Sequence, residues 1–150
     1  MDDVLFSLPM PTDIPPVIVV ALRAVYARTM EEGAGDSLGP AITNLLKKII
    51  HRSYDQLCQK VSELRSRDKF DTTERKPFPS FDSIYGQLTP TNFNLIGPLQ
   101  GALRSEVRLV FSTKLTNADF IRLAECWGEI LTCNELLREM IAPPEQRKKL

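Results

Sequence analysis

A long stretch without glycine or proline dominates the middle of this 150-residue chain. After Gly39-Pro40 the sequence runs to Arg67 with no helix breaker, and its apolar residues recur at helical spacing. Between Ile50 and Leu64 these residues follow steps of four and three, which is a short heptad seam. A helix over 40–67 would be ~42 Å long at ~1.5 Å per residue. We therefore predict one long central helix that serves as a spine for other helices or as a dimer contact.

Prolines mark where other helices begin, because proline fits the first turn of a helix and disrupts its interior. Thr89-Pro90 predicts a short helix, and Gly97-Pro98 predicts a second helix with a new axis that runs to Phe111. Gly101 and Ser105 follow Gly97 at four-residue spacing on one side of this second helix. We expect another helix to approach closely there.

The last helix is predicted to begin at Thr116 and to end before Pro143-Pro144. Thr116 is expected to cap this helix, with Asp119 three residues further on in the pattern of a capping box. Thr132 and Glu135 form a second candidate capping box, at which this helix could break. Residues 143–150 are expected to be a flexible tail.

The segments at the N-terminal end combine apolar residues with prolines. Residues 1–15 alternate large apolar side chains with prolines, so we predict an extended apolar arm that docks on its own chain or on a second copy. Residues 16–32 predict a first helix that is apolar on nearly all sides, which indicates deep burial or a shared interface. The connection over 68–88 is rich in aromatic residues and proline, and its aromatic residues are expected either to be pinned to the core, which we favour, or to serve as anchors for a partner.

No segment of the chain carries a convincing strand or hairpin signal. The predicted fold is therefore all-α: a single compact domain of five or six helices, with the arm and the long central helix described above.

The sequence carries no recognisable catalytic, cofactor or metal motif. His51, the only histidine, lies among Lys47, Lys48 and Arg52 and is expected to be a surface residue. The three cysteines lack the spacing of a zinc site, and no glycine-rich phosphate-binding loop is present. We therefore expect no catalytic residues, no cofactor, no metal and no small-molecule substrate.

The charge balance and the cysteine count constrain partners and compartment. The nineteen basic residues equal the nineteen acidic ones in number, which argues against extensive coating by nucleic acid. The charge is nevertheless polarised, since residues 1–36 carry six acidic and two basic residues while 37–76 carry nine basic and five acidic ones. An odd number of cysteines, no signal peptide and no apolar run long enough to span a membrane predict an intracellular protein, cytoplasmic or nuclear.

These observations favour a non-enzymatic interaction, adaptor or assembly domain that self-associates or binds a protein partner. The candidate protein interface comprises Val4, Phe6, Leu8, Val17, Val20, Tyr54, Leu57, Val61, Phe78 and Phe81. The alternative is a nucleic-acid-binding, viral matrix-like or nucleocapsid-associated protein. Its candidate polyanion surface comprises Lys47, Lys48, Arg52, Lys60, Arg65, Arg67, Lys69, Arg75 and Lys76.

Overall fold

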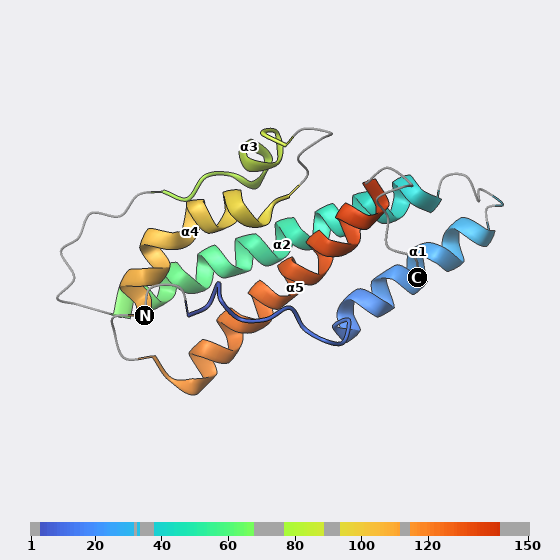
Figure 1. The fold of residues 1–150 in the computed structure, drawn as a ribbon. Coiled ribbons are helices and arrows are strands. Elements are labelled where there is room, and N and C mark those ends of the chain that lie inside the picture. The colour runs from blue at the N-terminus through green and yellow to red at the C-terminus, as the bar shows by residue number, and fades with distance from the viewer. Residues whose placement is uncertain are drawn as a thin grey trace.

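The structure is a computed structural model that describes residues 4–31, 33, 38–67, 77–88, 94–111 and 115–141. These residues form five helices and no strand, which confirms the all-α prediction (Figure 1). The helices are α1 (Pro16–Glu31), α2 (Leu38–Arg67), α3 (Phe81–Tyr85), α4 (Ile96–Phe111) and α5 (Asn117–Ile141).

Helix α2 is the predicted long central helix, and it begins two residues before Pro40. Its heptad seam is buried from Ile50 to Leu64. α5 makes the most extensive contact with α2, and α1 and α4 also pack on it. In Figure 1, α2 runs through the molecule with α4 and α5 beside it, while α1 lies at the end where α2 begins.

Helix α5 begins at the predicted capping box. The Asp119 N–H donates to the Thr116 hydroxyl oxygen at 3.1 Å, and the Thr116 N–H donates to the Asp119 carboxylate at 3.2 Å. The predicted break near Cys133 is wrong, because α5 continues to Ile141 as one helix. Thr132 is buried within this helix, so it packs in the interior instead of capping a new one.

Helix α4 begins at Ile96, which is two residues earlier than predicted. Asn94 starts it, because its side-chain oxygen accepts the Ile96 N–H at 3.0 Å. Asn134 of α5 accepts the Leu95 N–H at 3.0 Å and thereby ties this start to α5. The predicted close approach at Gly101 is wrong, since Gly101 is exposed and a Cβ built there would meet nothing within 4 Å. The short helix expected at Pro90 lies outside the described residues.

The connection before α4 contains a helix that the sequence did not predict. Ser80 caps α3, because its hydroxyl oxygen accepts the Ser83 N–H at 3.2 Å. Phe81 is buried, and the Tyr54 hydroxyl donates to the Pro79 carbonyl at 2.7 Å. These contacts pin this part of the connection to α2, as expected from its aromatic residues.

The N-terminal arm is not extended throughout. Residues 4–7 form a turn, in which the Leu8 N–H donates to the Leu5 carbonyl at 3.4 Å. The Ser7 hydroxyl also donates to the Val4 carbonyl, at 3.2 Å. Helical structure begins only at Pro16.

The arm docks on α5 of its own chain. The Phe6 ring meets the Trp127 ring edge-on, with 4.8 Å between the ring centres, and Leu5 is fully buried. A Cβ at Gly128 would lie 3.2 Å from the Pro11 ring, so glycine lets the arm lie close to α5. Burial of the front of the arm therefore needs no second chain.

This docking makes Phe6 a stability determinant. We expect Phe6→Ala to lower the free energy of unfolding by about 2 kcal/mol, which is less than for a fully buried phenylalanine because Phe6 is partly exposed. Met10→Ala is the matched control: Met10 is 47% exposed in the same arm, and its truncation should change stability by less than about 0.5 kcal/mol. Urea unfolding followed by the fluorescence of Trp127, the only tryptophan, measures both values. Equal effects of the two substitutions would contradict docking of the arm through Phe6.

Candidate functional site

Exposed large apolar side chains gather on one segment of the chain. Among the described residues, six of the seven such side chains lie between Met10 and Met30, and the seventh is Ile121. On α1 the exposed fraction is 49% for Val17, 66% for Val20 and 54% for Met30. Soluble proteins rarely expose a large contiguous apolar area without a role, so this segment is where a binding surface is sought first.

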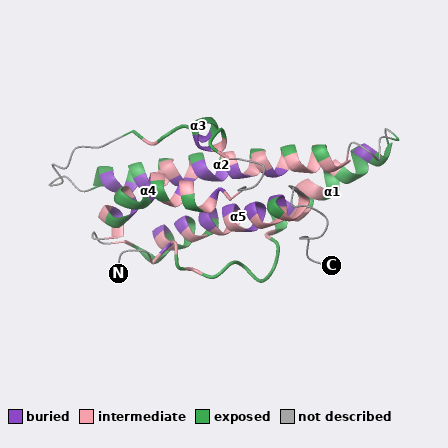
Figure 2. Cartoon of the chain, turned by 45° about the horizontal axis from the view of Figure 1, so that its top comes forward, coloured by how far each residue is buried: buried purple, intermediate pink, exposed green. Residues whose placement is uncertain are grey.

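Among the described residues, only one side of α1 is covered by the rest of the chain. Its buried residues are Ile18 and Thr29, and its main contact is with α2. Figure 2 shows α1 coloured mostly as exposed or intermediate, whereas α2 and α5 carry regular bands of buried residues. α1 therefore carries more apolar side chains than the described part of the chain buries.

The outer side of α1 carries a regular row of apolar residues. Val17, Val20, Ala24 and Ala27 are all exposed and follow steps of three, four and three. Residues at this spacing share one helix face. We call these four residues the α1 stripe.

A groove continues from the start of the α1 stripe towards α5. It has a volume of about 400 Å³, with Pro11, Pro15 and Val17 on one side and Glu125 and Glu129 among the residues on the other. Both carboxylates have partners within the chain. Glu125 pairs with Arg122 of α5 at 3.7 Å, and Glu129 accepts a hydrogen bond from Ser53 at 2.9 Å.

The structure separates the candidate interface residues into a buried and an exposed group. Tyr54, Leu57, Val61 and Phe81 lie in the core, so a partner has no access to them in this conformation. The partly buried members Phe6, Leu8 and Phe78 pack against that core, and Val4 lies in the turn of the arm. Val17 and Val20 are the members that remain exposed.

The candidate polyanion surface is divided in a similar way. Arg65 is buried and pairs with Glu106 of α4, and Lys47 lies over the Tyr85 ring at 4.1 Å. Lys60 and Arg67 both pair with Asp119 of α5, at 3.0 Å and 2.9 Å. Lys48 and Arg52 are exposed. Lys69, Arg75 and Lys76 lie outside the described residues.

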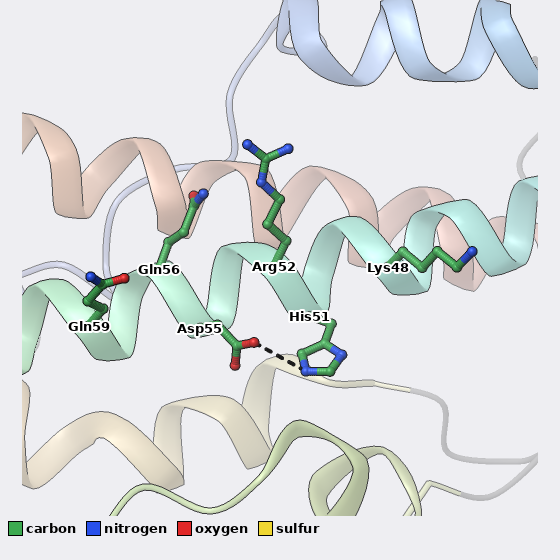
Figure 3. A pocket seen from close by; sticks show the side chains of 6 residues that line it. All are labelled: Lys48, His51, Arg52, Asp55, Gln56 and Gln59. Carbon is green, nitrogen blue, oxygen red and sulfur yellow. Dashed lines mark ion pairs between the residues drawn. The ribbon is translucent and has the colours of Figure 1, made fainter.

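Lys48 and Arg52 line an open groove of about 320 Å³ on α2, together with His51, Asp55, Gln56 and Gln59 (Figure 3). His51 pairs with Asp55 at 3.3 Å and stacks on the Phe81 ring, with 4.7 Å between ring centres. Figure 3 shows Arg52 and His51 pointing to opposite sides of α2. These side chains can form hydrogen bonds with a polar partner, but they do not converge on one point as a catalytic centre requires.

The three cysteines are free thiols, and each of them is at least partly buried. Burial raises the pKa of Cys58 to about 11 and that of Cys133 to about 12, and it also raises the pKa of Cys126. A thiol with a raised pKa is a poor nucleophile at neutral pH. Within the described residues, no three metal-binding side chains form a cluster, and no helix has the length and apolar character to cross a membrane.

No family model, curated protein or solved structure matches this chain. The exposed residues and grooves of the chain itself are therefore the basis for assigning a function. The sequence identified Val17 and Val20 as interface candidates, but it did not identify Tyr26 and Met30, which are equally exposed. The signal for them was present in the nearly uniform apolar character of residues 16–32.

The contacts of Asp119 predict a pH-dependent contribution to stability. The Lys60 ammonium, the capping residue Thr116 and Arg67 hold the pKa of the Asp119 carboxyl well below its usual range, although burial opposes them. A lowered pKa stabilises the folded state above the unfolded-state value of about 4, and this contribution is lost as the pH falls further.

We therefore expect Asp119→Asn to lower the free energy of unfolding at pH 7, by an amount that shrinks as the pH falls below about 4. Urea unfolding at a series of pH values measures the difference from wild type. Asp13→Asn, at an exposed position in the arm, is the control, and its free energy of unfolding should differ little from wild type at every pH of the series. A loss of stability at Asp119→Asn that is the same at every pH would contradict a charge-based role.

Proposed function

We propose that this chain is a non-enzymatic protein-interaction domain that self-associates through the outer face of α1. The observation that carries this proposal is the concentration of exposed large apolar side chains between residues 10 and 30. Covering such a surface contributes a favourable free energy of roughly 25 cal/mol per Å² of apolar area removed from water.

The distribution of burial supports α1 as the docking element. α2 and α5 each bury a face along their length, so their apolar residues are already used within the chain. α1 buries two residues, while Val17, Val20, Ala24 and Ala27 of the α1 stripe are exposed on its outer face. The same face on a second copy offers a partner of matching apolar character, and symmetric pairing would cover both faces at once.

An intracellular setting, cytoplasmic or nuclear, is part of this proposal. Three free thiols support it, because such thiols persist in reducing compartments.

The proposal predicts that a charge on the outer face of α1 dissociates the assembly. We expect the wild-type mass to rise with concentration above the 17.0 kDa of one chain, and Val20→Glu to remain at that value. Ile121→Glu is the matched control, since Ile121 is 54% exposed but lies on α5. Analytical ultracentrifugation over a concentration series gives the masses, and circular dichroism verifies that both variants keep their helices.

Two results would contradict self-association through this face. One is a wild-type mass that stays at 17.0 kDa at every concentration. The other is an equal loss of mass in Val20→Glu and Ile121→Glu, which would indicate a general effect of added charge.

Nucleic-acid binding is the second candidate function, and the observation in its favour is the exposed pair Lys48 and Arg52 beside the groove on α2. Several other cations of the candidate surface already have acidic partners within the chain. Phosphate-dependent binding needs several cations free to replace counterions and falls steeply with salt.

We therefore expect weak RNA binding that changes little with salt and little in the double variant Lys48→Glu/Arg52→Glu. Fluorescence anisotropy with a single-stranded RNA at rising salt measures both effects. A steep salt dependence that the double variant removes would favour the second function over the first.

A further inference from the structure

The α1 stripe has an internal asymmetry that bears on how two copies would meet. Its N-terminal half carries the larger residues Val17 and Val20, and its C-terminal half carries Ala24 and Ala27. We infer that α1 pairs with α1 of a second copy in antiparallel orientation, an inference that rests on the self-association proposed above.

Packing favours the antiparallel arrangement. It places Val20 of one copy opposite Ala27 of the other, so that a large residue meets a small one. Alternation of large and small residues across facing helices fills the space between them. A parallel pair would set valine against valine and alanine against alanine, which leaves a gap at the alanine end. Arg23 flanks the stripe, and its methylene groups can lie along it while the guanidinium stays in water.

The charges at the helix ends favour the same orientation. The first turn of α1 contains no acidic residue to offset the positive end of the helix dipole. Glu31 is exposed at the opposite end, where the dipole of its own helix disfavours a carboxylate. An antiparallel pair brings Glu31 of each copy beside Pro16 of the other, so each negative charge lies near a positive helix end.

The surface area that the outer face of α1 can bury is typical of a weak but specific dimer. α1 is ~24 Å long and ~10 Å wide, so its outer half presents roughly 400 Å². Together with Ile14, which is 43% exposed just before α1, two copies would bury roughly 1,000 Å² in total. This is near the lower limit for a biological interface, so the association should depend on concentration in the range that ultracentrifugation covers. The buried face of α1 rests on α2, which leaves the two protein bodies on opposite sides of the helix pair.

Cysteine cross-linking tests the orientation. The native thiols are at least partly buried and have raised pKa values, so cysteines introduced on α1 should react first. A histidine-tagged Val20→Cys chain is mixed with an untagged Ala27→Cys chain, equilibrated and mildly oxidised. Ultracentrifugation before oxidation establishes whether each variant still associates.

The antiparallel arrangement predicts that the mixed disulfide exceeds either disulfide between identical chains by at least about tenfold, because a disulfide needs Cβ atoms roughly 4 Å apart. Disulfides between identical chains in excess would overturn the orientation and favour a parallel pair. A statistical ratio of the three disulfide products, in a sample that was dimeric before oxidation, would overturn the proposed contact between the two α1 stripes. Absence of a dimer for wild type at every concentration would overturn the proposed function as well.

Discussion

The packing of α5 along α2 is the constraint on which the rest of the structure depends. The heptad seam of α2 is buried from Ile50 to Leu64, and α5 covers it with its own buried row. Charged contacts fasten the same pair of helices, because Asp119 at the start of α5 binds both Lys60 and Arg67 near the end of α2. Most large apolar side chains of α2 therefore lie in the core or pack against it, and several of its cations are already paired with carboxylates of the same chain.

This arrangement explains why α1 is left with an apolar outer face. α4 and α5 pack along α2, and α1 rests on it at the end where it begins (Figure 1). The arm that precedes α1 packs on α5 through Phe6, and its residue Leu5 is fully buried. Within the described part of the chain, this mostly apolar helix is in contact on one side only, and its opposite side carries the α1 stripe.

The features that local chemistry determines could be predicted from the sequence. The long central helix follows from apolar spacing without breakers, and the start of α5 follows from the capping pair Thr116 and Asp119. Contacts between distant residues could not be predicted in this way. The sequence suggests that Arg65 is a surface cation. In the structure it is buried and binds Glu106, which is 41 residues away in the chain. Glycine spacing similarly suggested a helix contact at Gly101, but which face a helix buries depends on its neighbours in space.

Hydrogen–deuterium exchange at two protein concentrations tests the central claim most directly. If the outer face of α1 is the surface of self-association, amides within 16–31 should exchange more slowly at high concentration, since pairing stabilises α1 against local opening. Amides of α5 over 117–141 that exchange by local opening should show the same rate in both samples, because pairing through α1 does not touch them. Protection that rises with concentration in α5 but not in α1, or that does not change anywhere, would contradict the account.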